Sequence, residues 1–160
     1  MNKKQIICDI LAHLERELLA IKNAANNAHL AATDDQSVAE TQYDTLAIEA
    51  SYLAEGQSRR VEEIKASITL FEHLSKQALD ELSQVSIGAL VKLEKDQSNN
   101  TWFFIGPASG GLRCEIEGQK ITLITPQSPM GSALMNKEEG DEVNIKLGNN
   151  VTTDFIDKIR

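Results

Sequence analysis

Carboxylates gather in one stretch of the sequence from which basic residues are missing. Between Lys22 and Arg59, 36 consecutive residues contain neither Lys nor Arg. The acidic residues of this stretch are Asp34, Asp35, Glu40, Asp44, Glu49 and Glu55. Carboxylate oxygens are hard ligands, and Mg²⁺ accepts one or two of them while it keeps several waters. The cluster as a whole therefore favours a contact with a cation or a basic surface.

Local helix chemistry offers a second interpretation of the same carboxylates. Residues 37–40 read S-V-A-E, the pattern of a capping box that starts a helix, and Glu40 closes that box. Asp34 and Asp35 lie just before this start, where negative charge favours the helix dipole. For any single carboxylate the capping interpretation is the stronger one, and both stay open here.

The remaining residues with catalytic or metal-binding chemistry are isolated in the sequence. His13, His29 and His73 lie on predicted helices without the spacing of a shared metal site. Cys8 and Cys114 belong to no CxxC motif and are far apart in the sequence, so we expect neither a disulfide framework nor a zinc site. This cysteine usage is typical of a reducing cytoplasm.

Composition narrows the class of protein further. The chain has 160 residues, of which 41% are hydrophobic and 25% charged, with a net charge of −8. That length suits one ordinary domain or two small ones. The negative charge argues against a basic groove for DNA or RNA, and no apolar run reaches the roughly 20 residues of a membrane helix. We expect a cytoplasmic protein without a membrane partner and without direct sequence-specific nucleic-acid binding.

The first half of the chain, residues 1–84, is predicted to form an antiparallel coiled-coil hairpin with an acidic tip near 33–44. Apolar residues follow each other at steps of four and three, the spacing of a coiled-coil seam. In the first helix these are Ile7, Leu11, Leu14, Leu18, Ile21, Ala25 and Ala28. In the second the seam positions are Leu46, Ala50, Leu53, Gln57, Val61, Ile64, Ile68 and Phe71, of which only Gln57 is polar. Helical character extends to Ser83-Gln84, where the pattern changes.

The second half, residues 85–160, is predicted to be a small β-rich domain. β-branched residues, glycines and all three prolines of the chain occur here. The expected strands are 86–94, 101–105, 112–116, 120–125, 142–147 and 151–159. Ser128-Pro129 has the form of a helix start, with Ser as the N-cap, and predicts a short helix over 130–135. The fold class is therefore α+β, with one short helix over an antiparallel sheet.

Several of these segments resemble one known family. Residues 125–137 read TPQSPMGSALMNK, and Gly140-Asp141-Glu142-Val143 follow. This pattern resembles the C-terminal domain of the bacterial GreA/GreB transcript cleavage factors. Residues 102–107, WFFIGP, and residues 43–45 and 48–54 of the second helix fit a divergent branch of that family. The resemblance covers the whole chain and implies an FKBP-like fold for its second half.

The resemblance implies a partner and a mechanism. Members of the family bind RNA polymerase, seat the C-terminal domain at the rim of the secondary channel and pass the hairpin down the channel. Carboxylates at the tip then help the polymerase to hold a second Mg²⁺ and a water, so that backtracked RNA is hydrolysed. The factor is thus not an enzyme alone and has no cofactor or stably bound metal of its own. The Mg²⁺ is supplied in the polymerase active site.

The resemblance assigns roles to particular residues of this chain. Asp34, Asp35 and Glu40 are the expected tip carboxylates, with Asp44 in reserve. The expected polymerase-binding residues are Ser128, Pro129, Met130, Gly131, Lys137, Gly140 and Asp141. An alternative is that the Ser128–Asp141 pattern only stabilises the domain.

The tip departs from the family pattern. GreA and GreB read Gly-Asp-Leu-x-Glu-Asn-Ala-Glu-Tyr there, whereas residues 33–43 of this chain read TDDQSVAETQY. Acidic residues are present without the Asp-x-x-Glu spacing. A regulator that binds in the channel without stimulating cleavage is therefore the second hypothesis. A coiled-coil chaperone has no dedicated motif here, and prolyl isomerisation would need an aromatic-lined pocket that the few aromatic residues of the domain do not promise.

Overall fold

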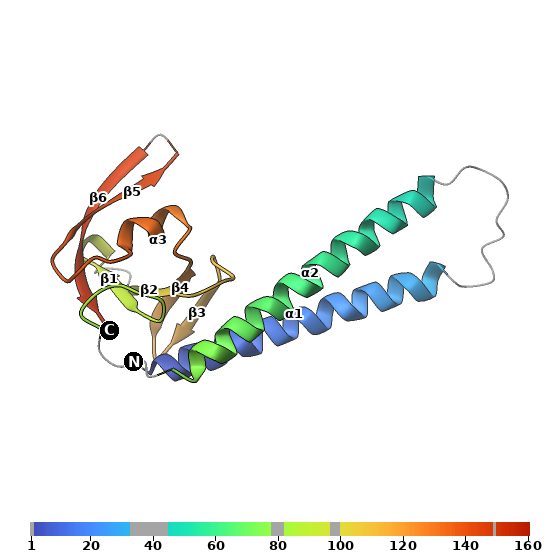
Figure 1. Cartoon of the computed structure of the whole chain (residues 1–160), viewed down its shortest axis with the longest axis horizontal. Helices are drawn as coiled ribbons and strands as arrows, with labels where there is room; N and C mark the ends of the chain where they lie inside the picture. The colour runs from blue at the N-terminus through green and yellow to red at the C-terminus, as the bar shows by residue number, and fades with distance from the viewer. Residues whose placement is uncertain (1, 33–44, 78–81, 97–99, 149) are drawn as a thin grey trace. The chain divides into compact units, whose positions relative to one another are not determined.

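The computed structural model describes residues 2–32, 45–77, 82–96, 100–148 and 150–160, without the side chains of 27–32, 45–55, 96 and 147. The elements in chain order are α1 Lys3–Ala32, α2 Thr45–Ser75, β1 Leu90–Leu93, the 3₁₀ turn η1 Glu94–Asp96, β2 Thr101–Ile105, β3 Arg113–Ile116, β4 Gln119–Ile124, α3 Pro129–Leu134, β5 Glu142–Leu147 and β6 Asn150–Ile159 (Figure 1). They form two compact units, one of Met1–Leu11 with Thr69–Arg160 and one of Ala12–Ile68. The expected division at residue 84 stays a prediction.

The unit of residues 12–68 consists of the paired stretches of α1 and α2. Leu14 and Ile64 are buried at 3% and 2% exposure, because the apolar stripe of each helix faces the other. The half-buried members of the predicted seam are Leu18, Ile21, Ala25, Gln57, Val61 and Ile68. These positions confirm the seam, while Ala28, Leu46, Ala50 and Leu53 lie outside the described side chains.

An ion pair joins the two helices at a defined register. Arg60 Nη2 lies 2.7 Å from Glu17 Oε1, and Arg60 Nη1 lies 3.4 Å from Glu63 Oε2. The hydrogen bond to Glu17 is the main cause of the raised pKa of Arg60, which burial alone would lower. Both partners are partly exposed, so this pair fixes the register more than it adds to stability.

The other unit contains a six-stranded sheet in the order β3-β4-β2-β1-β6-β5. The fold class is the expected one, with a correction to strand direction. We expected an antiparallel sheet, but β2 and β4 are parallel, with Thr101 opposite Lys120 and Ile105 opposite Ile124. The sheet is therefore mixed. Strand β3, which lies between β2 and β4 in the sequence, pairs antiparallel with β4 and forms one edge of the sheet.

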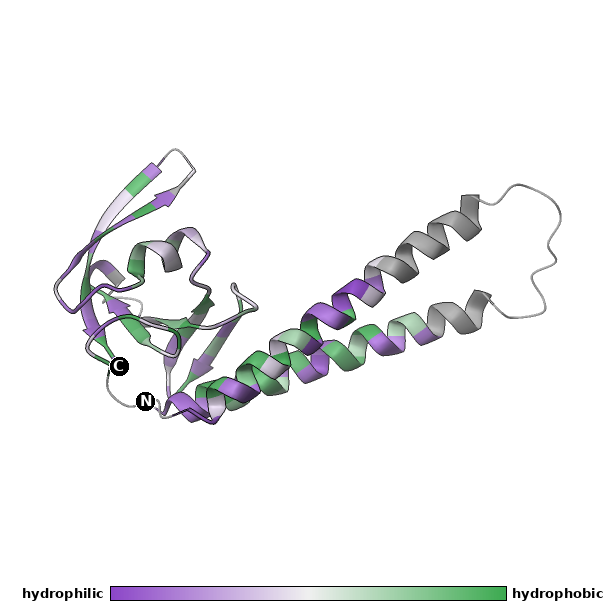
Figure 2. Ribbon diagram, in the orientation of Figure 1, coloured by the Kyte–Doolittle hydropathy of each residue, from purple (hydrophilic) through white to green (hydrophobic). Residues whose placement is uncertain are grey.

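Each face of the sheet has its own hydrophobic cover. On one face, buried residues of the strands pack with α3 through Leu134, and Figure 2 shows hydrophobic residues along β2, β4 and α3. On the other face, Phe71 of α2 approaches Gly106 and Leu123. A Cβ on Gly106 would lie 2.4 Å from Leu123 Cδ1 and 3.0 Å from Phe71 Cζ. Glycine at 106 therefore leaves room for these two side chains.

Two element boundaries differ from the sequence-based expectation by several residues, and others differ by one. Helix α2 ends at Ser75, not near Gln84, and Leu82–Gln84 are not helical. Strand β1 starts at Leu90, not at Ser86. The chain turns before it, because Gly88 has a φ of 91° and the amide of Ala89 donates a hydrogen bond to the carbonyl of Ser86. The start of the second helix at the capping box lies outside the described residues.

Replacing Ile64 by Ala should destabilise the helical hairpin by about 2–5 kcal/mol, because it removes buried methyl groups from the seam. The matched change on the same helix is Leu70→Ala, whose side chain is 44% exposed and which should cost far less. Urea unfolding followed by far-UV circular dichroism measures both. Equal losses in the two variants would contradict this packing of the seam.

Candidate functional site

The segment before α3 is held by a serine hydroxyl that bonds in two directions. Ser128 Oγ donates to the carbonyl of Thr125 at 2.7 Å and accepts from the amide of Gly131 at 3.0 Å. Ser128 is thus the N-cap of α3, and Pro129 occupies the first helical turn, where a missing amide proton costs nothing. The sequence-based prediction of this helix start is confirmed.

Gly131 lies directly against the carbonyl of Thr125. A Cβ at position 131 would lie 1.9 Å from Thr125 O and 2.8 Å from Thr125 C. No side chain fits there, since the obstacle is backbone and cannot rotate away. Gly131 therefore allows α3 to approach the end of β4 closely.

The turn after α3 is fixed by backbone and side-chain bonds. Asp141 Oδ2 accepts from the amide of Glu138 at 2.9 Å, and the amide of Gly140 donates to the carbonyl of Ile156 at 2.8 Å. Gly140 has a φ of 86°, which favours glycine. The carbonyl of Lys137 accepts a hydrogen bond from the backbone amide of Val85 at 2.8 Å. This turn is therefore attached to β6 and to the chain before β1.

These contacts divide the seven expected polymerase-binding residues into two groups. Ser128, Gly131, Gly140 and Asp141 take part in the contacts that shape the domain. The side chains of Pro129, Met130 and Lys137 are exposed or half-buried. If this segment binds a partner, the second group supplies the contact and the first group supplies its shape.

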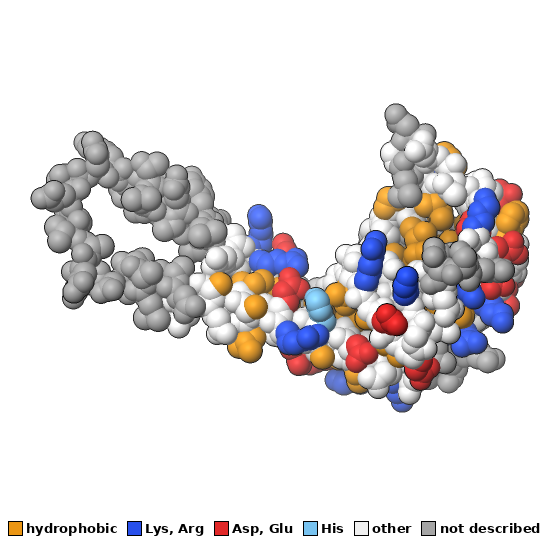
Figure 3. Space-filling model, turned by 180° about the vertical axis from the view of Figure 1, so that it is seen from behind, with side chains coloured by type: hydrophobic (Ala, Val, Ile, Leu, Met, Phe, Trp, Pro, Cys, Tyr) orange, Lys and Arg blue, Asp and Glu red, His pale blue; other side chains and the backbone are white. Residues whose placement is uncertain are grey.

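Met130 also lines a groove that the sequence analysis did not predict. The groove has a volume of about 720 Å³. Its apolar lining includes Phe103, Ile124, Met130 and Ile145, and its polar lining includes Arg113, Cys114, Glu115 and Lys120. Figure 3 shows hydrophobic side chains exposed on the β domain with charged side chains around them. The groove offers an apolar surface with charges at its border beside the Ser128–Met130 segment.

Cys114 has no activated thiol in this groove. Burial raises the pKa of the Cys114 thiol, and the charge of Asp9 raises it further. A raised pKa keeps the thiol protonated and unreactive. Cys114 is half-buried and does not belong to the buried core.

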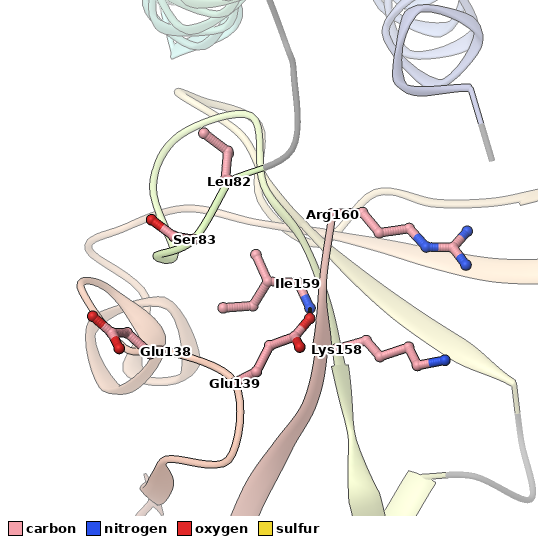
Figure 4. A pocket seen from close by; sticks show the side chains of 7 residues that line it. All are labelled: Leu82, Ser83, Glu138, Glu139, Lys158, Ile159 and Arg160. Atoms are coloured by element: carbon pink, nitrogen blue, oxygen red, sulfur yellow. Dashed lines mark hydrogen bonds between the residues drawn. The ribbon is translucent and has the colours of Figure 1, made fainter.

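A second pocket of about 630 Å³ lies at the end of β6. It is lined by Leu82, Ser83, Glu138, Glu139, Lys158, Ile159 and Arg160 (Figure 4). Glu139 Oε1 accepts from the amide of Ile159 at 2.7 Å, so this carboxylate is engaged by backbone. The pocket contains both signs of charge and is more polar than the groove.

The expected tip carboxylates, Asp34, Asp35 and Glu40, lie outside the described residues, as does Asp44. In the part of the chain that the structure describes, no three His, Cys, Asp or Glu side chains are placed to hold a metal ion. His13 and His73 are exposed. None of the described helices is long and apolar enough to cross a membrane.

Comparison with known families matches residues 80–160 to the model described as "Transcription elongation factor, GreA/GreB, C-term". The chain belongs to the GreA/GreB family. The matched range contains the whole segment from Thr125 to Asp141, and it spans all strands of the sheet. Members of this family are factors associated with RNA polymerase and are not enzymes themselves, so RNA polymerase is the partner that membership implies.

Similar solved structures include three of the factor Gfh1. One, of "the transcription factor Gfh1", is 16% identical, with 98% of this chain and 92% of that chain covered at a TM-score of 0.38. Thermus aquaticus Gfh1 is 20% identical, with 92% of each chain covered and a TM-score of 0.35. The GreA factor homolog 1 of Thermus thermophilus is 19% identical, with 94% of each chain covered and a TM-score of 0.34. No curated protein sequence matches the chain.

Replacing Gly131 by Ala should destabilise the β domain by about 1–3 kcal/mol or more, because the new methyl group meets the Thr125 carbonyl. The control is Gly56→Ala in α2, where an added Cβ meets nothing within 4 Å. That change should be neutral or stabilising by up to about 1 kcal/mol. Thermal unfolding followed by Trp102 fluorescence and by circular dichroism compares the two. Unchanged stability of the Gly131 variant would contradict the close approach.

Proposed function

We propose that this protein binds RNA polymerase at its secondary channel and promotes rescue of backtracked complexes by stimulating the transcript cleavage of the polymerase. The observation that carries the proposal is the family match over residues 80–160, which includes the whole Ser128–Asp141 segment. Binding is assigned to the β domain, and the chemistry to carboxylates at the tip of the hairpin.

The binding surface of this proposal consists of Pro129, Met130 and Lys137 with the neighbouring groove. Met130 connects the segment to the groove, because its side chain lines it. An apolar surface with charged residues at its border is the usual composition of a protein interface. In this proposal, the hydrogen bonds of Ser128 and the close packing of Gly131 on the Thr125 carbonyl hold these side chains in place. Ser128 and Gly131 do not contact the partner themselves.

The chemical part of the proposal concerns the tip. One or two carboxylates from Asp34, Asp35 and Glu40 would complete the coordination of a second Mg²⁺ in the polymerase. The metal would activate a water and stabilise the leaving oxygen of the RNA. The polymerase supplies the other ligands, so the factor alone would be inactive.

Lys137→Glu should weaken polymerase binding by about threefold to tenfold, because it reverses one charge at the border of the proposed surface. The matched control is Lys146→Glu, an exposed lysine on β5 outside the proposed surface. Surface plasmon resonance with immobilised core polymerase measures both, and circular dichroism verifies their folding. Equal affinity of the parent and of several variants in the 129–137 segment would remove this segment from the interface.

Asp34→Asn/Asp35→Asn should abolish Mg²⁺-dependent shortening of RNA in a backtracked complex while polymerase binding stays nearly intact. Asparagine keeps the size of each side chain and removes the charge that a metal requires. Glu40→Gln preserves the capping box, so a loss of cleavage in that variant assigns Glu40 to the metal and not to the helix. Glu62→Gln, on the exposed surface of α2, is the control.

The parent protein decides between this proposal and its alternative. If the parent binds polymerase and gives no RNA shortening, it is a regulator of the channel that does not stimulate cleavage. If the parent cleaves and the Asp34, Asp35 and Glu40 variants cleave equally well, other residues carry the chemistry.

A further inference from the structure

Three basic residues and the one tryptophan of the chain share a face of the sheet. Lys92 of β1 is the cross-strand partner of Lys158 of β6. Because Leu90 pairs with Phe104, Trp102 of β2 lies opposite Lys92 on its other side. Arg160 follows Lys158 by two residues, so both side chains extend from the same face of the strand, as Figure 4 shows. We call these four residues the basic patch.

The indole ring organises two of the cations. Lys92 Nζ lies 5.9 Å and Arg160 Cζ 5.1 Å from the centroid of the Trp102 ring. Both distances are within the range of cation–π attraction, which holds the ammonium and the guanidinium over the ring. Lys158 and Arg160 are exposed and Lys92 is half-buried, whereas Trp102 is only 3% exposed.

The cations of the basic patch lie beside one another without a neutralising ion pair in the described part of the chain. Like charges on directly opposite residues of neighbouring strands repel, as Lys92 and Lys158 do. Among the described residues, no carboxylate forms an ion pair with Lys92, Lys158 or Arg160. The buried Nε1 of Trp102 has no acceptor there either, but it is closed to a ligand from solvent. The accessible polar groups of the basic patch, those of Lys92, Lys158 and Arg160, are all cationic hydrogen-bond donors, which an anion would satisfy.

We propose that the basic patch binds carboxylates of an acidic segment of a partner protein. Side chains two residues apart on a strand are about 7 Å apart, so Lys158 and Arg160 match alternate acidic residues of an extended chain. The residues of the basic patch lie outside the Ser128–Asp141 segment, although Glu138 and Glu139 of that segment line a pocket together with Lys158 and Arg160. The proposal does not depend on transcript cleavage.

Nucleic acid fits the basic patch less well. Binding of single strands commonly uses exposed aromatic rings as stacking platforms, and Trp102 is covered. Glu138 and Glu139 line the pocket that also contains Lys158 and Arg160, and the whole chain carries a charge of −8. A long phosphate backbone would meet these negative charges, whereas a short acidic segment contacts only the basic patch.

Titration of the full chain with a hexaglutamate peptide at low salt tests the proposal. Because Trp102 is the only tryptophan of the sequence, its emission reports directly on the basic patch. We expect a saturable change in emission, with the same dissociation constant from isothermal titration calorimetry. Raising the salt should weaken the binding, because the contacts are partly exposed.

Variants assign the binding to named residues. Lys158→Gln should weaken hexaglutamate binding by about threefold to tenfold, and Arg160→Gln by a similar factor. Lys158 is the sharper test, because its cation is not over the ring and its loss should leave the starting emission unchanged. The control is Lys146→Gln on β5, an exposed lysine outside the basic patch, and circular dichroism verifies the fold of all variants.

Three outcomes would overturn the proposal. One is the absence of saturable binding at low salt by both methods. Another is an equal loss of affinity in the Lys146 and Lys158 variants, which would show only a general effect of net charge. The third is tighter binding of an oligothymidylate of equal charge, which would assign the basic patch to phosphate and so to a nucleic acid.

Discussion

A single hydroxyl group determines the geometry of the candidate binding segment. Ser128 Oγ contacts the carbonyl of Thr125 on one side and the amide of Gly131 on the other, so the chain reverses within a few residues. Because Gly131 has no Cβ, α3 approaches the end of β4 closely enough for Leu134 to enter the core. Met130 is then left at the border of the groove. The apolar core and the outward-facing side chains are therefore positioned by the same bonds.

This arrangement explains how one short motif both shapes the domain and leaves some of its side chains accessible. The residues that are chemically most distinctive in the motif are the ones engaged in backbone contacts, as Asp141 is with Glu138. The less distinctive side chains of Pro129, Met130 and Lys137 remain accessible. A motif can thus identify a family through residues that shape the domain, while other side chains of the same motif stay accessible.

Local patterns predicted the elements that depend on local chemistry. Strands β2 and β5 have the expected bounds, and Ser128 caps α3 as the Ser-Pro pair indicates. The start of β1 was placed too early, because the alternation of residues 86–89 resembles a strand while Gly88 turns the chain. The extension of α2 to Gln84 was wrong for a related reason: good helix formers continue beyond Ser75, but the chain there is not helical at Leu82.

Pairing between distant segments was less accessible from the sequence. Alternation gives the faces of a strand but not the direction of its neighbour, so the parallel β2–β4 pair was missed. The groove and the basic patch were also missed, because each is assembled from several strands. Lys92 and Lys158 are far apart in the sequence and become neighbours only through the β1–β6 pairing.

The order of strands in the sheet has a consequence for how the domain folds. β3 and β4 are joined by a two-residue turn, in which Glu117 and Gly118 both have positive φ, so this hairpin requires only local contacts. β5 and β6 form a second local hairpin. By contrast, β1 pairs with β6 across most of the domain sequence, and closing so long a loop costs more entropy. Assembly is thus expected to begin with the two hairpins. The pairing of β1 with β6, which joins the β5–β6 hairpin to the rest of the sheet, is expected to be the slow step.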